Sequence, residues 1–119
     1  MALLTREQIL SADDIKSQRV KVPEWGGDVI VRTMTGDERD EFEMAAVSDD
    51  GERLKVARSK IRATIVMLSC VNGKGKRLFT IEDVEALGQR SSAALDRVVA
   101  VAQELSKIGD EELEAAGKG

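Results

Sequence analysis

A proline- and glycine-rich turn between two strand-like runs limits the possible folds of this chain more than any other feature. Residues Gln18–Val22 alternate, with Val20 and Val22 on one face, as in a half-buried β-strand. Residues 23–28 read Pro-Glu-Trp-Gly-Gly-Asp and carry strong turn signals, and a second β-branched run covers 29–33. The pattern predicts a β-hairpin with a glycine-rich tip.

Helices are predicted on both sides of this hairpin. The residues at 5–8 and 35–38 have the form of capping boxes, and those at 80–83 form a weaker version that ends in Asp. We expect a short N-terminal helix, an acidic helix over 35–47, a long helix over 52–71, a short helix over 81–87 that Gly88 stops, and a last helix from Ser91 or Ser92 that Gly109 ends. A mobile loop is expected at 72–76.

The later helices carry apolar residues at helical spacing, which predicts their buried faces. In the long helix these are Leu54, Ala57, Ile61, Ile65 and Leu68, widened by Val66, Met67 and Cys70. In the last helix they are Leu95, Val98, Val99, Ala102 and Leu105, and in the acidic helix Phe42, Ala45 and Ala46. The fold class predicted is α+β, mostly α, with an N-terminal β-hairpin followed by a small bundle of about four helices.

The 119 residues amount to a single domain. Residues 1–34 should hold the short helix and the hairpin, residues 35–109 the helical part, and residues 110–119 a frayed acidic tail. A domain of this size buries a modest core, so a partner or a second copy can contribute to its folded state.

The residue inventory argues against catalysis. The chain has no His and no Tyr, and Cys70 is its single cysteine. The commonest general base, the commonest metal ligand and an activated thiol are therefore missing. We expect no enzyme activity, no catalytic residues, no metal site and no cofactor.

The start of the chain lacks the basic residues and the long apolar run of a signal peptide. No apolar stretch approaches the ~20 residues that span a membrane. A lone thiol in an apolar stretch suits a reducing compartment. These features predict a cytoplasmic protein.

Charge is sorted along the chain, whose net charge is −4. Residues 24–50 hold nine acids and two bases, and residues 51–77 hold eight bases and one acid. Such blocks predict charge-complementary contacts within the fold or between copies. The acids Glu38, Asp40, Glu41 and Glu43 lie at a helix start, where the dipole favours them, and are interpreted as solvated.

The basic block leaves one alternative function open. Residues 73–77 read Gly-Lys-Gly-Lys-Arg but lack the glycine spacing and the Lys-Ser/Thr pair of a P-loop. Together with Lys55, Arg58 and Arg62 they could form a nucleic-acid patch, so the alternative is a small nucleic-acid-binding regulatory protein that uses the basic block 53–77. Overall acidity and scarce aromatic residues argue against it.

The hairpin is the other candidate for binding. Trp25 at its tip could plug the helical layer or anchor a partner, and the sequence does not choose between these. The outer strand edges leave backbone groups unpaired, which predicts a homo-oligomer or an extended partner segment. The candidate partner-binding residues are Trp25, Gly26, Gly27, Val29 and Val31 in the hairpin, with Lys55, Arg58 and Arg62 on the long helix.

Two segments carry a family resemblance. Residues 20–32 read VKVPEWGGDVIVR, and residues 34–39 read MTGDER. In this order they resemble the tail assembly chaperones of long, non-contractile-tailed bacteriophages and their prophages, the lambda-like tail assembly proteins. The resemblance implies a protein that binds the tape-measure protein, keeps it soluble, helps recruit the major tail protein and is absent from the mature virion.

Overall fold

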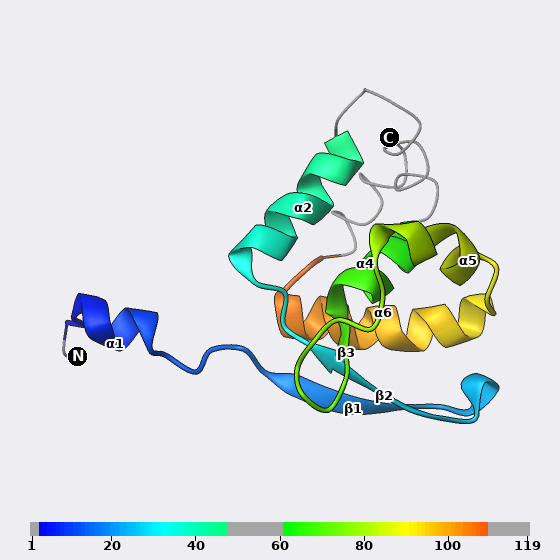
Figure 1. Cartoon of the computed structure of the whole chain (residues 1–119), viewed down its shortest axis with the longest axis horizontal. Helices are drawn as coiled ribbons and strands as arrows, with labels where there is room; N and C mark the ends of the chain where they lie inside the picture. Colours follow the sequence, from blue (N-terminus) through cyan, green and yellow to red (C-terminus); the bar gives the residue numbers. More distant parts are fainter. Residues whose placement is uncertain (1–2, 48–60, 110–119) are drawn as a thin grey trace.

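The computed structural model describes residues 3–47 and 61–109 (Figure 1). In chain order the elements are α1 (Arg6–Leu10), β1 (Ser17–Val22), the 3-10 turn η1 (Pro23–Trp25), β2 (Gly27–Arg32), α2 (Gly36–Val47), α4 (Ile61–Ser69), β3 (Cys70–Val71), the 3-10 turn η2 (Ile81–Asp83), α5 (Val84–Gly88) and α6 (Ser92–Ser106). The mixed, mostly helical fold that was predicted is confirmed. The part of the predicted long helix before Ile61, with Leu54 and Ala57, lies outside the described residues.

The predicted hairpin is confirmed. β1 and β2 pair antiparallel, with Val20 opposite Val29 and Val22 opposite Gly27. The turn closes at Gly26, whose φ of 76° lies in the left-handed region and whose N–H donates to the carbonyl of Pro23 at 3.0 Å. Glycine adopts this conformation without the steric cost of a Cβ, which explains why the tip contains it.

The sheet has a third strand that the sequence did not predict. The helix does not continue to Val71, because α4 ends at Ser69 and the next two residues form β3. Cys70 pairs with Val31 and Val71 with Ile30, which gives the strand order β1-β2-β3. The strand conformation of these two residues is favourable, because it pairs backbone groups on the edge of β2 that a longer helix would leave unpaired.

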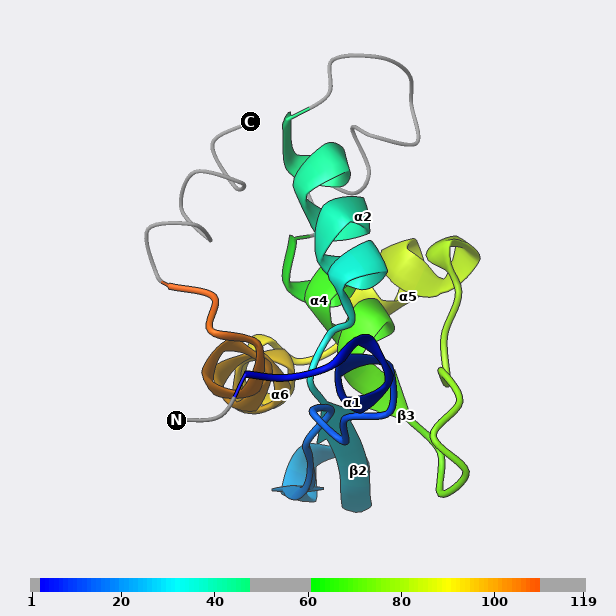
Figure 2. The same ribbon diagram turned by 90° about the vertical axis from the view of Figure 1, so that its left-hand side faces the viewer.

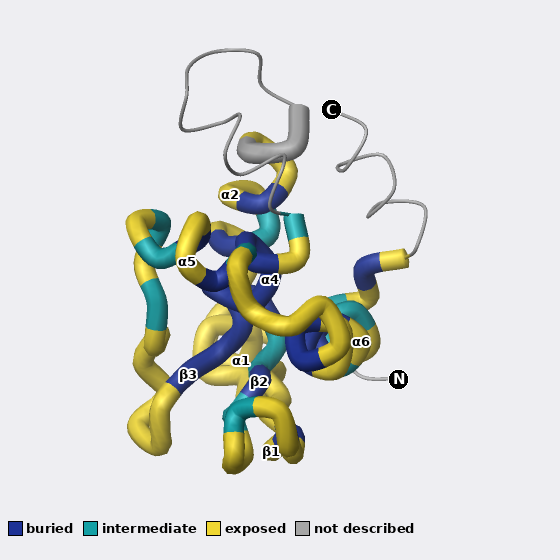
Figure 3. Tube along the Cα trace, turned by 90° about the vertical axis from the view of Figure 1, so that its right-hand side faces the viewer, coloured by how far each residue is buried: buried dark blue, intermediate teal, exposed yellow. Residues whose placement is uncertain are grey.

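The helices form a layer on one face of the sheet. α6 packs on β1 and β2, and α4 packs against α6, α5 and α2 (Figures 1 and 2). Every residue of α4 from Ala63 to Ser69 is buried, and Figure 3 shows the helix as the centre of the core. The predicted faces of α4 and α6 therefore lie in the core, although Ile61 and Leu105 are only partly buried.

Local signals set most helix ends. At the start of α1, the Thr5 N–H donates to Gln8 Oε1 at 2.9 Å and the Gln8 N–H donates to Thr5 Oγ1 at 3.2 Å, which confirms the capping box. The end of α6 was predicted incorrectly. It lies at Ser106, followed by Lys107 in the left-handed conformation with φ 57°, and not at Gly109.

The N-terminal arm, residues 3–15, stands apart from the rest of the chain. α1 contains no buried residue, and it extends away from the body in Figure 1. Residues 3–15 are all exposed. The arm therefore contributes nothing to the core described above.

Candidate functional site

A buried carboxylate joins the hairpin to α2. Two parallel hydrogen bonds of 2.7 Å link the Arg32 guanidinium to the Glu38 carboxylate. Arg77 Nε donates to Glu38 Oε2 at 2.9 Å, and the N–H of Thr35 donates to Oε1 at 2.9 Å. The Glu38 side chain is 8% exposed. Its interpretation as a solvated acid was therefore wrong, because two arginines compensate its burial.

The hydrogen bonds decide the charge of this carboxyl group. Burial alone would raise the pKa of Glu38, but the bonds from Arg32, the Thr35 backbone and Arg77 outweigh it and lower the pKa to about 2. Arg77 also contacts Glu41 at 3.4 Å. Glu38 and Glu41 belong to the acidic block and Arg77 to the basic block, so charge-complementary contact within the fold is confirmed.

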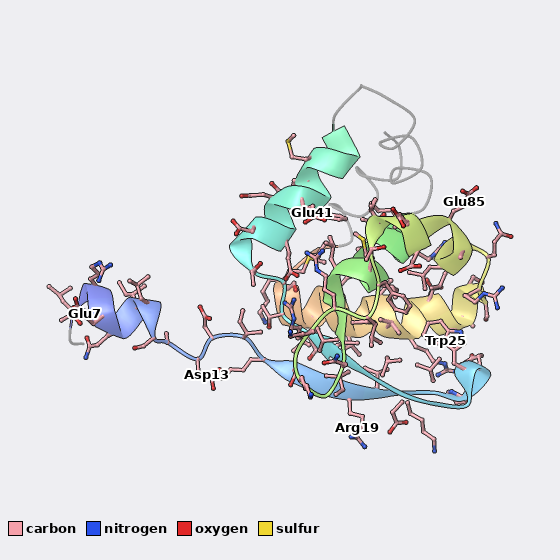
Figure 4. The ribbon with its side chains drawn as sticks, viewed as in Figure 1. Glu7, Asp13, Arg19, Trp25, Glu41 and Glu85 are labelled. Atoms are coloured by element: carbon pink, nitrogen blue, oxygen red, sulfur yellow. The ribbon has the colours of Figure 1, made fainter. Side chains whose placement is uncertain are left out.

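Trp25 lies between the hairpin tip and α6 (Figure 4). Its side chain is partly buried and packs against the core. Beside it, Arg97 Nε of α6 donates to both carboxylate oxygens of Glu24, at 3.0 and 3.2 Å. This hydrogen bond is the main cause of the lowered pKa of Glu24. The tip is thus attached to α6, with part of the indole left at the surface.

The other candidate residues lie in different surroundings. Gly26 and Gly27 are exposed and Val29 is partly buried, whereas the Val31 side chain is fully buried in the core. Arg62 lies at the start of α4, where its Nε donates to Asp96 Oδ1 at 2.6 Å. Lys55 and Arg58 lie outside the described residues. The structure thus brings Trp25 and its neighbours together on the hairpin, and Arg62 lies on another element.

Sequence reasoning missed a set of exposed apolar side chains. Large apolar side chains with more than a third of their surface exposed are Leu3, Leu4, Ile9, Leu10, Ile15, Met44 and Leu78. Five of these seven belong to the N-terminal arm. The available signal was the short length of α1, because a five-residue helix that follows Leu3-Leu4 and ends in Ile9-Leu10 cannot bury these side chains by itself.

An open groove lies beside β2, the middle strand of the sheet. β3 pairs with only the second half of β2, at Ile30 and Val31, so β3 does not cover Gly27–Val29. The groove has a volume of about 540 Å³ and is lined by Arg19, Gly27, Asp28, Val29, Ile30, Val71, Asn72, Gly73 and Leu78. Its lining combines apolar side chains with the Arg19–Asp28 ion pair (3.9 Å), Asn72 and the uncovered backbone of β2, a composition suited to an extended peptide.

The described part of the chain holds little reactive chemistry. No group of three or more Cys, Asp or Glu side chains in residues 3–47 and 61–109 is placed to hold a metal ion. Burial raises the pKa of the Cys70 thiol to about 12. None of the described helices is long and apolar enough to cross a membrane. The described surface instead carries exposed apolar side chains, an uncovered strand edge and charged side chains.

Comparison with known proteins agrees with this picture. The structure resembles that of the bacteriophage HK97 tail assembly chaperone with a TM-score of 0.57 and 16% sequence identity, over 83% of this chain and 94% of that chain. At this identity the likeness concerns the fold alone. No curated protein sequence matches. The sequence model of the phage tail assembly chaperones matches residues 5–118, so the chain belongs to the phage tail assembly chaperone family.

Proposed function

We propose that this protein binds the tape-measure protein of its phage, keeps it soluble in the host cytoplasm, helps recruit the major tail protein, and is absent from the mature virion. It acts by binding alone, without catalysis or a cofactor, and several copies act together. Membership of the chaperone family supports the general role. The partners and the sequence of events are our inference.

The exposed apolar side chains carry this proposal. Among residues 3–47 and 61–109 the sheet, α4 and α6 build a core, yet seven large apolar side chains remain at the surface. A tape-measure protein is a very long helical chain whose apolar stripes aggregate until the tail tube encloses them. Covering such stripes requires apolar surface on a soluble body.

The charges favour a protein partner over nucleic acid. Two arginines of the basic block already contact acids: Arg62 pairs with Asp96, and Arg77 with Glu38 and Glu41. Phosphate binding at these positions would have to displace carboxylates. The basic block is therefore partly neutralised within the fold.

Co-expression tests the proposal. With the tape-measure protein of the same phage, this chain should raise the soluble fraction of that protein and co-purify with it in several copies. One compact domain covers a short length of helix, so a long client needs many. A tape-measure protein that is equally soluble with and without this chain would contradict the proposal.

Charge reversal separates the two candidate partners. Lys55→Glu, Arg58→Glu and Arg62→Glu together should leave tape-measure solubility largely intact, because the contact is mainly apolar. They should abolish binding if nucleic acid is the partner. Lys21→Glu, a reversal at an exposed position of β1, is the matched control for added negative charge. Salt-sensitive duplex binding that only the triple variant loses would support the nucleic-acid alternative.

A further inference from the structure

The N-terminal arm is an apolar segment that stays exposed in the part of the chain that the structure describes. Its side chains include Leu3, which is 95% exposed, and Leu10, which is 69% exposed. The arm nevertheless has local order, because the capping box at Thr5 fixes the start of α1. An ordered segment that exposes this much apolar surface gains free energy when another surface covers it.

The groove beside β2 has the complementary chemistry. Its lining includes Leu78, which is itself among the exposed large apolar side chains, together with Ile30 and Val71. The lining also includes residues 27–29 of β2, whose edge β3 leaves uncovered. An extended segment lying there could bond to that edge while its apolar neighbours fill the hollow.

Charge also matches. The arm carries Asp13 and Asp14 in the extended stretch after α1, and both are exposed. The loop that continues from the groove carries Lys74 and Lys76, which are also exposed. Within residues 3–47 and 61–109 neither these lysines nor the two aspartates form an ion pair. Opposite charges at the rim of an interface fix orientation and speed association.

The arm leaves its own body in the wrong direction to reach its own groove. Lys16 is fixed to the sheet by three hydrogen bonds with Thr33. The Thr33 N–H donates to the Lys16 carbonyl at 2.8 Å, the Thr33 hydroxyl donates to the same carbonyl at 3.3 Å, and the Lys16 N–H donates to Thr33 Oγ1 at 3.1 Å. From that fixed point the arm continues away from the hairpin tip, as Figure 1 shows. Return to the same chain's groove would need a full reversal within residues 12–15.

We propose that the arm of one copy docks in the β2 groove of a second copy. The extended residues 12–15 lie along the Gly27–Val29 edge, with the two aspartates toward Lys74 and Lys76, and the apolar residues of α1 cover Leu78. Each copy offers one arm and one groove at different places, so the contact is heterologous and more than two copies can join. This inference concerns copy-to-copy contact and does not depend on tape-measure binding. The two contacts use the same apolar side chains of the arm and Leu78, so one arm serves only one of them at a time.

The mass of the purified full-length protein, measured by light scattering over a range of concentrations, tests the role of the arm. The unmodified chain should self-associate, and Ile9→Ser with Leu10→Ser should weaken association by about tenfold or more, because apolar burial is lost. Met44→Ser is the matched control, since Met44 is exposed to a similar extent (63%) but lies on α2. A strictly monomeric unmodified protein, or an arm variant of unchanged mass, would overturn the proposal.

A charge exchange tests the pairing itself. Asp13→Lys with Asp14→Lys should weaken association, and so should Lys74→Glu with Lys76→Glu. Combining all four changes in one chain should restore it, because each interface then has opposite charges again. If the variant with all four substitutions associates more weakly than either double variant, the proposed contact is contradicted.

Cross-linking distinguishes two copies from one. A chain with Leu10→Cys mixed with a chain with Leu78→Cys should form a disulfide-linked pair of unlike chains, while the buried Cys70 stays unreactive. Reaction within a single chain that carries both substitutions, with none in the mixture, would show that the arm folds back on its own body. That result would overturn the proposal.

Discussion

The guanidinium of Arg32 and the carboxylate of Glu38 face each other through two hydrogen bonds of 2.7 Å, which join the end of β2 to the first turn of α2. Both residues belong to the two sequence segments that carry the family resemblance. Their side chains are 14% and 8% exposed, so they are largely withdrawn from any partner. These positions in the two segments therefore serve the fold, and binding has to be sought elsewhere on the surface.

Removing the charge of Glu38 should destabilise the protein. Glu38→Gln leaves Arg32 with a buried and uncompensated charge, so we expect the free energy of unfolding to fall by about 3 kcal/mol. Urea denaturation measures this. Glu43→Gln is the control, because Glu43 pairs with Arg39 at an exposed site and its loss should cost less than about 0.5 kcal/mol. Equal losses in the two variants would contradict a special role for Glu38.

The same carboxylate should make stability depend on pH. The pKa of Glu38 is lowered from 4.5 to about 2 in the folded protein, so the unfolded chain binds more protons between these values. Its contribution is fully present above pH 4.5, amounts to about 3 kcal/mol, and is lost as the pH falls toward 2. Denaturation curves at several pH values should show this slope, and Glu38→Gln should flatten it. A variant with the full slope would assign the effect to other acids.

The Cys70 thiol should be unreactive in the folded protein. It is fully buried, and burial raises its pKa to about 12, so almost no thiolate exists near pH 8. A chromogenic disulfide reagent should react with one thiol per chain in urea and very slowly without it. Rapid and complete reaction under native conditions would show that β3 opens easily from the sheet.

Trp25 should report on both stability and binding. It is the single Trp of a chain without Tyr, so intrinsic emission comes almost entirely from it. Because the indole is partly buried against α6, its emission should lie between the exposed and buried limits and shift to shorter wavelength when a partner covers it. Trp25→Ala should cost about 2 kcal/mol, less than full aromatic burial, and Trp25→Phe less. Emission that does not change on tape-measure binding would show that Trp25 does not lie in the contact.

Sequence reasoning predicted what local signals determine. The capping residues at Thr5 and Thr35, the alternation at Val20 and Val22, and the serine cap at Ser91 each act within a few residues, and each gave a correct element. The apolar face of α6 followed from its period in the same way.

The features that were missed depend on distant partners. Cys70 and Val71 continue an apolar helical run, and only the free edge of β2 makes them a strand. Glu38 reads as an ordinary acid at a helix start until Arg77, 39 residues later, is placed beside it. The arm was predicted as a helix, but its separation from the body depends on the position of every other element.

The direct passage from α4 into β3 has a mechanical consequence. No loop separates Ser69 from Cys70, so α4 and β3 form one continuous segment that ends at the turn at 72–76. A displacement of that turn is transmitted to the core, because no flexible loop lies between the strand and the helix to absorb it. A segment that binds in the groove beside β2 and displaces β3 should therefore displace α4 with it.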